Sequence, residues 1–458
     1  MLYLQTLRGR RPLVTALRLA LVSLLFAAAR ARAQTITEYP VPTTASVPFD
    51  ITAGPDGNLW FTEFTTGIRT IGRITPDGAI TEFPLPPNPA NGPFGIAAGS
   101  DGNLWFTLSP LSDAPGNSAI GRITPAGVAA ADIPLPDGSV PLGIAAGPDG
   151  NLWFVLSGTN AIGRITTSGV VTQFPIPTAA SSPAAIAAGA DGNLWFTELD
   201  ANKIGRITTS GVITEFPIPT AGSQPAEITA GPDGAIWFNE LAANQIGRIT
   251  TAGAFTEFPV PTPNAFPEGG EIVAGPDGNL WFTENSANKI GRMTTSGAVT
   301  EFAVPTANSG PSAIAKGPDG NIWFTEELGN KIGRITTGPL GPCAPDGHTL
   351  CLNSDRFSVT ASFRVASTDT ATPATAVPLT GDSGYFWFFG PNNVELVVKV
   401  LNACAPFGSY WFFAAGLTDV EVEITVTDRH TGASKIYRNE AGTPFAPIQD
   451  TSAFSTCP

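Results

Sequence analysis

The chain has 458 residues, 14% of them charged, and its formal net charge of −14 makes nucleic acid an unfavourable partner. Hydrophobic residues make up 42% of the chain, which is too many for a disordered protein, and 50 glycines and 43 prolines favour short strands joined by turns. Composition therefore predicts a folded, all-β protein that does not bind polyanions.

Residues 1–33 have the pattern of a secretory signal peptide. Arginines precede an apolar run from Leu19 to Ala29, and Ala31-Arg32-Ala33 matches a small-x-small cleavage site. This run is short for a bilayer core of about 30 Å, and no later apolar run exceeds it. We therefore expect cleavage after Ala33, no integral membrane segment in the mature chain, and a secreted, periplasmic or cell-envelope location.

Seven copies of an Asp-Gly-x-x-Trp-Phe segment recur at intervals of 42 to 48 residues, and each is followed by Ile-Gly-Arg. A repeat of this length is typical of the four-stranded blade of a β-propeller. Residues 34–342 are therefore predicted to form a seven-bladed β-propeller. The tryptophans that anchor the seven copies are Trp60, Trp105, Trp153, Trp195, Trp237, Trp281 and Trp323.

The repeat from Pro225 to Pro261 illustrates the predicted blade. Its four strands, A to D in chain order, are separated by turns such as Pro232-Asp233-Gly234 and Thr251-Ala252-Gly253. A proline ends strand D because it cannot donate a hydrogen bond inside a ladder. The strands are expected at Ile228–Ala230, Ala235–Glu240, Gln245–Ile249 and Ala254–Phe258.

The two ends of the repeat array complement each other. The last repeat stops at Gly338 without a strand D, and an unassigned strand-like segment, Ile36–Pro42, stands before the first repeat. Pairing this N-terminal strand with the last blade removes both open edges of the array. We therefore expect the first strand of the mature chain to close the ring.

The residues that every repeat shares are explained by folding. The Asp-Gly pairs, beginning at Asp56, suit hairpin turns that need a positive φ. The tryptophans are expected to fill the gaps between blades, and the arginines, beginning at Arg73, to bond backbone carbonyls or neighbouring blades. Binding sites are more often carried by loops than by repeated scaffold residues, so the loops are the place to look for function.

Acidic residues gather in the loops at one face of the predicted ring. The loop that enters strand A and the loop that joins strands B and C share this face, so carboxylates from several blades can converge near the axis. Oxygen ligands of this kind suit a hard divalent cation, and Glu268, Glu271 and Glu284 form the preferred cluster. The candidates are Glu63, Glu198, Glu240, Glu284 and Glu326 at the ends of the strands B, and Asp50, Glu227, Glu268 and Glu271 in the loops entering the strands A.

An alternative interpretation of the strand B glutamates needs no ligand. Lys203, Lys289 and Lys331 lie five residues after the glutamates of their own hairpins, and these residues can form solvated ion pairs at the rim of the ring. Exposed pairs of this kind contribute little to stability. Spacing alone leaves both interpretations open.

Residues 35–338 resemble the virginiamycin B lyase (streptogramin lyase) family, through repeats such as Gly231–Glu240 and Asn288–Arg292. The resemblance implies a seven-bladed propeller that opens cyclic streptogramin B depsipeptides by elimination at an ester bond, with Mg²⁺ and a histidine base. The cation would polarise the ester and stabilise the enolate while the base removes the α proton. The resemblance matches Glu268 and Glu284 with the metal-binding glutamates of the family.

The sequence departs from the family at the histidine base. In the family this residue precedes the apolar start of strand A by two positions, and no residue at the matching positions here can abstract a proton. Both histidines of the chain, His348 and His430, lie beyond the repeats. A carboxylate such as Glu227 or Glu271, with its pKa raised by burial, would have to replace the base. The matching positions are Phe49, Phe94, Leu142, Ala184, Ala226, Gly270 and Ser312.

Two functions follow from these observations. The first is an exported binding or scaffold propeller that recognises a peptide, a glycan or a small cyclic depsipeptide through its acidic face. The second is a Mg²⁺-assisted lyase in which a carboxylate opens the depsipeptide ester. The missing histidine favours the binding protein, and whether the chain is an enzyme stays open. A monomer is expected in either case.

Residues 343–458 are predicted to form a separate, small β-sandwich. The tryptophan repeat ends here, and Phe357–Val365 and Asp419–Thr427 alternate apolar and polar residues as half-buried strands do. The aromatic runs Tyr385–Phe389 and Tyr410–Phe413 suit either its core or a ligand-stacking platform. The segment resembles a Cys-bounded C-terminal module of exported bacterial proteins that ends in the pattern seen at Pro447–Asp450. Its four cysteines predict two disulfides, with three possible pairings among Cys343, Cys351, Cys404 and Cys457.

Overall fold

The computed structural model describes residues 34–454, apart from 66–67, 89–90, 111–117, 267–269, 338–342, 344, 366–370, 392 and 430–433. Its strands form seven four-stranded sheets and two five-stranded sheets. The predicted signal peptide and the predicted domain boundary at residue 342 lie outside the described residues, so both stay predictions. Within the described ranges, no helix is both long and apolar enough to cross a membrane.

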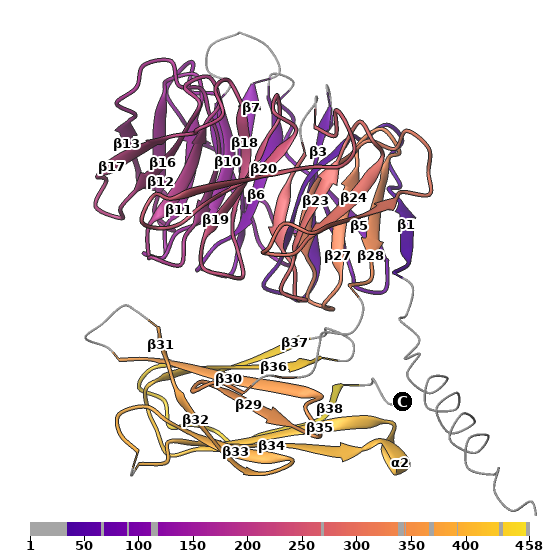
Figure 1. Ribbon diagram of the computed structural model, residues 1–458, viewed down its shortest axis with the longest axis vertical. Coiled ribbons are helices and arrows are strands. Elements are labelled where there is room, and N and C mark those ends of the chain that lie inside the picture. The colour runs from indigo at the N-terminus through magenta and orange to yellow at the C-terminus, as the bar shows by residue number, and fades with distance from the viewer. Residues whose placement is uncertain are drawn as a thin grey trace, which may run out of the picture. The chain divides into compact units, whose positions relative to one another are not determined.

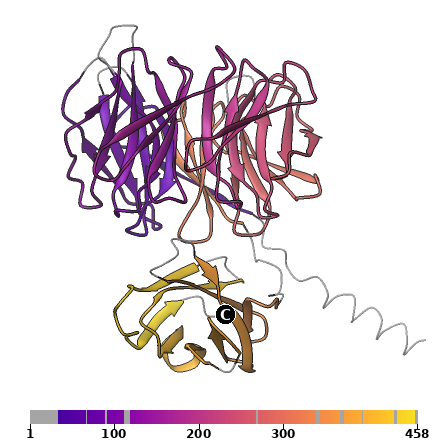
Figure 2. The ribbon, with the colours of Figure 1, turned by 90° about the vertical axis from the view of Figure 1, so that its left-hand side faces the viewer.

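The seven four-stranded sheets are the blades of a β-propeller, as predicted. The first strand of each blade contacts the first strand of the next, and β26 of blade 7 contacts β2 of blade 1, so the ring is closed. Two views at right angles show the blades side by side (Figures 1 and 2).

Each blade is an antiparallel meander, and its strands A to D follow in chain order. Blades 1 to 3 comprise β2 (Pro48–Ala53), β3 (Leu59–Thr65), β4 (Ile68–Ile74) and β5 (Ile80–Pro84); β6 (Asn91–Ala98), β7 (Leu104–Pro110), β8 (Ala119–Ile123) and β9 (Ile133–Pro134); and β10 (Pro141–Ala146), β11 (Leu152–Leu156), β12 (Ala161–Ile165) and β13 (Val171–Pro175). Blades 4 and 5 comprise β14 (Pro183–Ala188), β15 (Leu194–Glu198), β16 (Lys203–Ile207) and β17 (Ile213–Pro217); and β18 (Pro225–Ala230), β19 (Ile236–Glu240), β20 (Gln245–Ile249) and β21 (Phe255–Pro259). Blades 6 and 7 comprise β22 (Ile272–Ala274), β23 (Leu280–Glu284), β24 (Lys289–Met293) and β25 (Val299–Ala303); and β26 (Pro311–Lys316), β27 (Ile322–Glu326), β28 (Lys331–Ile335) and β1 (Ile36–Pro40).

The N-terminal strand supplies strand D of the last blade, which confirms the predicted closure. Strand β1 pairs antiparallel with β28, and the register places Ile36 opposite Ile335 and Pro40 opposite Lys331. The backbone N–H of Thr336 continues the ladder by donating to the carbonyl of Thr35 at 3.1 Å. Backbone hydrogen bonds therefore close the ring.

The repeat tryptophans are fully buried between neighbouring blades, as predicted. Trp60 of blade 1 packs with Leu104 and Phe106 of blade 2, and Trp323 of blade 7 packs against blade 1 in the same way. Each indole N–H donates to the aspartate of its own Asp-Gly turn at 2.9 to 3.1 Å. Burial of one tryptophan contributes at most about 4 to 6 kcal/mol from its apolar area. These seven side chains are therefore a main source of cohesion between the blades.

The repeat arginines connect each blade to the next through backbone carbonyls. Arg73 Nη1 donates to the carbonyl of Pro125 in blade 2 at 3.2 Å, and its guanidinium lies over the ring of Trp60. Arg334 Nη1 of blade 7 donates to the carbonyl of Pro76 in blade 1 at 2.8 Å. The arginines therefore have the scaffold role that the sequence predicts.

The strands beyond residue 343 form two five-stranded sheets around one hydrophobic core, which confirms the predicted β-sandwich-like fold. The first sheet contains β29 (Thr349–Leu352), β30 (Phe357–Arg364), β31 (Thr372–Pro373), β36 (Glu421–Asp428) and β37 (Ser434–Asn439). The second contains β32 (Thr375–Thr380), β33 (Ser383–Trp387), β34 (Leu396–Ala403), β35 (Ser409–Gly416) and β38 (Ile448–Phe454), and the short helix α2 (Cys404–Phe407) follows β34.

The two aromatic runs of this sandwich divide between its core and its surface. Phe386 and Phe412 are fully buried, whereas their strand neighbours Trp387 and Phe413 are half-buried. This division follows from the alternation of side chains along a strand, which sends neighbouring residues to opposite faces of the sheet. The core therefore accounts for part of each run.

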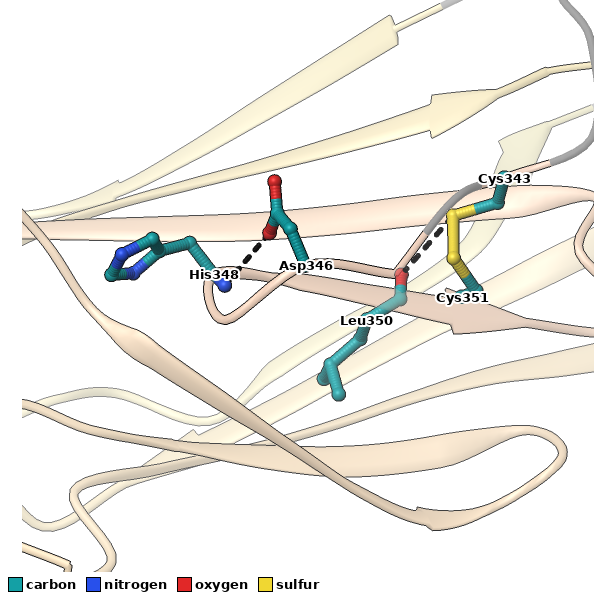
Figure 3. Close-up of a disulfide and its surroundings, with 5 residues drawn as sticks. All are labelled: Cys343, Asp346, His348, Leu350 and Cys351. Carbon is teal, nitrogen blue, oxygen red and sulfur yellow. Dashed lines mark hydrogen bonds between the residues drawn. A yellow bond between two sulfur atoms is a disulfide. The ribbon is translucent and has the colours of Figure 1, made fainter.

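One disulfide of this sandwich is fully described. Cys343 bonds to Cys351 and encloses a turn in which the backbone N–H of His348 donates to Asp346 (Figure 3). Cys404 is also disulfide-bonded, and Cys457 lies outside the described residues. The His348 ring nitrogen Nδ1 lies 2.8 Å from the carbonyl oxygen of Ala374, so this histidine has a structural partner.

Candidate functional site

A hollow of about 160 Å³ lies at the axis of the ring, where the seven strands A begin. Every blade contributes to its wall, and blades 1, 5 and 6 contribute Asp50, Glu227 and Glu271. We call it the axial hollow. It is lined by Phe49, Asp50, Phe94, Gly95, Gly143, Ile144, Ala185, Ile186, Glu227, Ile228, Gly270, Glu271, Ser312 and Ala313.

A ring of hydrogen bonds holds the wall of the axial hollow in place. In blade 1, the backbone N–H of Asp50 donates to Thr62 Oγ1 at 3.0 Å, and this hydroxyl donates to the carbonyl of Phe94 in blade 2 at 2.8 Å. Val155 of blade 3 has no polar group for this role. Sequence reasoning missed the ring, although a polar residue two positions after most repeat tryptophans was its signal. The side chains that accept a backbone N–H in this way are those of Thr62, Thr107, Thr197, Asn239, Thr283 and Thr325.

The three carboxyl groups of the axial hollow influence one another's ionisation. Burial raises the pKa of Asp50 to about 7, although two backbone N–H groups donate to its oxygens and oppose the shift. Burial and then the charge of Asp50 raise the pKa of Glu227 to about 8. Burial, followed by the charges of Asp50 and Glu227, holds the pKa of Glu271 well above its usual range. The structure therefore brings these three candidates together near the axis.

The same three carboxyl groups differ in their hydrogen bonds. Asp50 accepts the backbone N–H groups of Ile51 and Ile96, both at 2.7 Å, and Glu271 Oε2 accepts that of Ile314 at 2.6 Å. Glu227 has no side-chain hydrogen bond to any residue that the structure describes. Its carboxyl group is therefore the one most available to a ligand.

An aromatic cluster faces part of the axial hollow. The ring centroids of Phe49 and Phe94, which both line the hollow, are 4.5 Å apart. Phe64 packs against both rings, with centroid distances of 5.6 and 5.4 Å. The hollow thus combines carboxyl groups from three blades with aromatic rings from two.

The glutamates at the ends of the strands B lie outside the axial hollow, so the structure does not bring them together there with Asp50, Glu227 and Glu271. None of them lines the axial hollow, and the carboxyl oxygen Oε1 of Glu240 lies beside Gly247 of strand C, on the side away from strand A. All five side chains are fully buried, and none of their carboxyl oxygens has a hydrogen bond of normal geometry to a described residue, although a serine or threonine side chain near each acts to lower its pKa. These residues are Glu63, Glu198, Glu240, Glu284 and Glu326.

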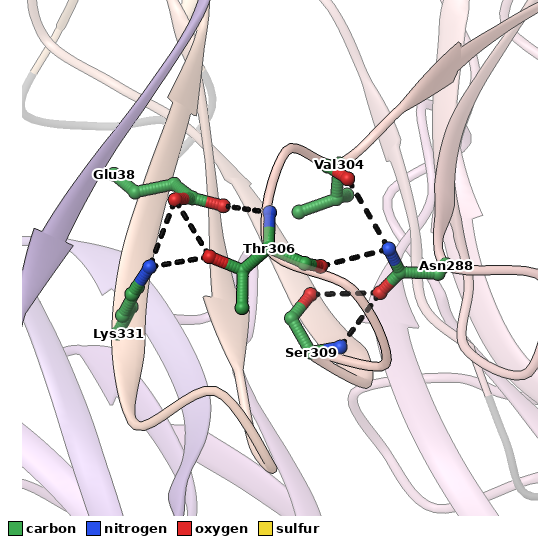
Figure 4. A network of polar contacts seen from close by, with 6 residues as sticks. All are labelled: Glu38, Asn288, Val304, Thr306, Ser309 and Lys331. Carbon is green, nitrogen blue, oxygen red and sulfur yellow. Dashed lines mark hydrogen bonds and ion pairs between the residues drawn. The ribbon is translucent and has the colours of Figure 1, made fainter.

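The predicted ion pairs of these glutamates with lysines are wrong. Lysines 203, 289 and 331 lie on strand C and pair with the glutamates of the neighbouring strand D: Lys289 Nζ lies 2.7 Å from Glu301 Oε2, and Lys331 Nζ lies 2.9 Å from Glu38 Oε2 (Figure 4). A lysine side chain is long enough to cross to the outer strand, which spacing along one hairpin does not reveal. Among the described residues the strand B glutamates form no direct ion pair, although the charges of Lys203, Lys289 and Lys331 act to lower the pKa of Glu198, Glu284 and Glu326.

Enclosure shifts the ionisation of the strand B glutamates. Burial, helped by the charge of the nearby strand D glutamate, raises the pKa of Glu63 and Glu198 to about 8. The same two causes raise the pKa of Glu240, Glu284 and Glu326 to about 7. These residues are therefore largely protonated below neutral pH.

The preferred metal cluster of Glu268, Glu271 and Glu284 is not assembled by the described residues. Glu271 lines the axial hollow and Glu284 does not, while Glu268 lies outside the described residues. In the ranges that the structure covers, no group of three or more His, Cys, Asp or Glu side chains has an arrangement that could hold a metal ion. The described residues alone therefore do not assemble this cluster, and the Mg²⁺ site that the family resemblance implies stays a prediction.

Comparison with known proteins agrees with the fold. A family model described as "Virginiamycin B lyase family" matches residues 29–216, 112–269 and 178–340. The crystal structure of virginiamycin B lyase from Staphylococcus aureus is 42% identical, with a TM-score of 0.60, and the match covers 66% of this chain and 99% of that one. A catalytically inactive histidine-to-alanine variant of that enzyme with quinupristin is 41% identical, also with a TM-score of 0.60, over 66% of this chain and 99% of that one.

Curated sequences give shorter matches to the same kind of protein. Virginiamycin B lyase of Bordetella parapertussis is 45% identical over 51 residues, which is 11% of this chain and 16% of that protein. The one from Saccharopolyspora erythraea is 49% identical over 53 residues, 12% of this chain and 17% of that protein. The chain thus spans about a sixth of the length of these curated relatives in each match.

Proposed function

This chain belongs to the virginiamycin B lyase family, and from that premise we propose that it is a binding propeller whose axial hollow takes an organic cation. The observation that carries the proposal is the pairing of Asp50, Glu227 and Glu271 with the aromatic rings of Phe49 and Phe94 in one hollow. In this proposal the chain keeps the propeller of the family and does not use its histidine-based elimination.

The sequence around the hollow supports a change of function. The histidine-to-alanine variant of the Staphylococcus aureus enzyme is catalytically inactive. In this chain, the seven positions that the resemblance matches with the histidine base of the family hold phenylalanine, leucine, alanine, glycine or serine, and both histidines lie beyond residue 343. A side chain of these types cannot accept a proton at neutral pH.

The chemistry of the hollow favours a cationic ligand. Three like charges in one enclosed space disfavour each other, and an ammonium group would offset that repulsion. An aromatic face adds an attraction of about 0.5 to 2 kcal/mol for a cation that leaves water. A volume of about 160 Å³ is roughly that of five water molecules, enough for a small ammonium head group.

A matched pair of ligands tests this proposal on residues 34–458. Choline and 3,3-dimethylbutan-1-ol have nearly the same shape, but only choline is charged. We expect calorimetry at pH 8 to detect choline binding and no binding of the neutral alcohol. Glu227→Gln should weaken choline binding at least tenfold. Equal affinity for both ligands, or unchanged choline affinity in the variant, would refute the proposal.

A second candidate is a lyase that uses a carboxylate base. It is favoured by Glu227, because burial brings its pKa to about 8, within the range of a general base near neutral pH. The test is ring opening of a streptogramin B depsipeptide with and without Mg²⁺. Turnover that is lost in Glu227→Gln or Glu271→Gln would establish this second function in place of the first.

Export is part of the proposal. It rests on the signal-peptide pattern of residues 1–33 and on the cysteine pairs of the C-terminal sandwich, since disulfides persist in oxidising compartments. N-terminal sequencing of the protein recovered outside the cytoplasm should begin at Gln34. A mature chain that begins at Met1 would contradict it.

A further inference from the structure

Three blades contain the same seat for an ammonium group, formed by a threonine and the glutamate of strand D. In blade 6, Lys289 Nζ lies 2.7 Å from Thr262 Oγ1 and 2.7 Å from Glu301 Oε2. In blade 7, Lys331 Nζ contacts Thr306 and Glu38 in the same way (Figure 4). Lys203 occupies the corresponding position in blade 4.

Blade 5 keeps the oxygens of this seat but has no lysine. Thr220 Oγ1 lies 3.0 Å from Glu257 Oε2, close to the 2.8 Å between Thr262 and Glu301 in blade 6. Gln245 takes the place of the lysine: it lies opposite Glu240 in the strand register, as Lys289 lies opposite Glu284. The positive charge of the seat is therefore missing in blade 5, while its two oxygens are retained.

Two further residues in blade 5, Gln245 and Glu240, have buried side-chain oxygens without hydrogen-bond partners among the described residues. Gln245 Oε1 is enclosed and has no hydrogen-bond partner among the described residues. Glu240 is fully buried, and neither of its carboxyl oxygens has a hydrogen bond of normal geometry to a described residue, although the nearby Ser223 side chain acts to lower its pKa. Blade 1 also lacks the lysine and has Thr70 in its place. Unlike the amide oxygen of Gln245, the Thr70 hydroxyl is not a buried oxygen without a hydrogen-bond partner. The strand B glutamates of blades 1, 4, 6 and 7 are in the same state, so blade 5 differs by the additional unpartnered oxygen of Gln245 and by the missing ammonium group.

We propose that blade 5 binds a Ca²⁺ ion through oxygens of Glu257, Thr220, Gln245 and Glu240. Calcium takes carboxylate, amide and hydroxyl-type oxygens in flexible arrangements at about 2.3 to 2.6 Å, slightly closer than the lysine nitrogen of blade 6. Two carboxylates neutralise its charge, and water molecules can complete its coordination. The ion takes the place that an ammonium group occupies in the sister blades.

The site would order a segment that is important for the axial hollow. Thr220 begins the loop that leads into β18, and the start of β18 carries Glu227. The backbone N–H of Thr220 already donates to Glu257 Oε1 at 3.1 Å, so the loop is attached to the strand that holds the ion. Binding of Ca²⁺ in blade 5 does not require an organic cation in the axial hollow.

Reciprocal substitutions in blades 5 and 6 test the proposal. Equilibrium dialysis of residues 34–458 with radioactive Ca²⁺, after removal of metal by a chelator, should give one ion per chain at millimolar Ca²⁺. Gln245→Lys supplies the ammonium group found in blade 6 and should reduce the stoichiometry to zero. Lys289→Gln recreates the blade 5 seat in blade 6 and should raise it to two.

Three controls make the result interpretable. Circular dichroism checks that each variant is folded, and Gln245→Met removes the amide oxygen without adding a charge in case Gln245→Lys does not fold. Glu227→Gln removes an acid of the axial hollow and should leave one ion bound, which separates this site from the hollow. A folded wild-type chain that binds no Ca²⁺, or one whose stoichiometry is the same after Gln245→Lys and Gln245→Met, overturns the proposal.

Discussion

The side chain of Asp50 in blade 1 accepts the backbone N–H of Ile96 in blade 2, at 2.7 Å from Oδ2. Its other oxygen accepts the N–H of Ile51, also at 2.7 Å. Asp50 therefore links two blades through hydrogen bonds and is also a candidate binding residue of the axial hollow. Glu271 makes the same kind of tie to Ile314 in blade 7, whereas Glu227 makes none within the described residues.

Asp50→Ala should destabilise the propeller more than Glu227→Gln. The alanine leaves two enclosed backbone N–H groups without acceptors, at a cost of about 1 to 3 kcal/mol each. Glu227→Gln removes no described hydrogen bond and relieves repulsion, so its free energy of unfolding should stay within about 0.5 kcal/mol of wild type. Urea denaturation measures both. A larger loss for Glu227→Gln than for Asp50→Ala would show that the tie is unimportant.

The free energy of unfolding should fall as the pH rises from about 4.5 to about 8. The five strand B glutamates titrate near 4.5 when unfolded, and burial raises their pKa to about 7 or about 8 when folded. The folded chain therefore binds more protons in this window, and stability is lost as they dissociate. Each group contributes at most about 3 to 5 kcal/mol, since one pKa unit corresponds to about 1.4 kcal/mol and residual contact with water reduces the effect.

Denaturation at pH 5, 7 and 9 measures this dependence. Glu326→Gln is the matched variant, because it keeps the shape of the buried side chain and cannot ionise. The variant should show a shallower fall in stability with pH than wild type. Stability that increases steadily from pH 5 to pH 9 would mean that these glutamates are ionised in the folded chain.

Thr197→Val should weaken the contact between blades 4 and 5. Thr197 accepts the N–H of Ala185 at 3.1 Å and donates to the carbonyl of Ala226 at 2.6 Å, and valine of similar shape satisfies neither group. We expect a loss of about 1 to 3 kcal/mol in the free energy of unfolding. Val155, which occupies the same position in blade 3, provides the control: Val155→Thr should be neutral or stabilising. Equal changes in the free energy of unfolding for the two variants would argue against a stabilising role for these hydrogen bonds between blades.

Removal of residues 34–42 should destabilise the propeller more than its length suggests. The deletion takes away β1, which leaves β28 as an open edge and ends the closure of the ring. We expect a lower unfolding temperature and concentration-dependent association, measured by calorimetry and light scattering. Adding back a synthetic peptide of residues 34–42 should restore part of the stability. A truncated chain as stable and monomeric as wild type would contradict this role.

Most of the fold could be predicted from the repeat residues, because each of them has a single structural role. The spacing of Trp60 and its six counterparts defines the blades, Arg73 ties one blade to the next, and Ile36–Pro40 fills the missing strand. The predicted convergence of Asp50, Glu227 and Glu271 depended only on the symmetry of the ring.

The positions of the strand B glutamates could not be predicted in the same way. Glu198 lies opposite Lys203 in the register, but the lysine amine binds Thr178 and the strand D residue Glu215 instead. Sequence spacing gives the separation of two Cα atoms and not the direction in which a long side chain extends. The absence of a lysine at Gln245 becomes meaningful only when the blades are compared in space.

The pairing of β1 with β28 affects the order in which the protein can fold as it is made. The partners Ile36 and Ile335 are the first and last strand residues of the propeller, so nearly 300 residues must follow β1 before it finds its neighbour. The earlier blades can form hairpins as they emerge, because their contacts are local in sequence. The ring itself can close only after Ile335 has been synthesised, and until then the first strand remains available to other edges, including those of a second chain.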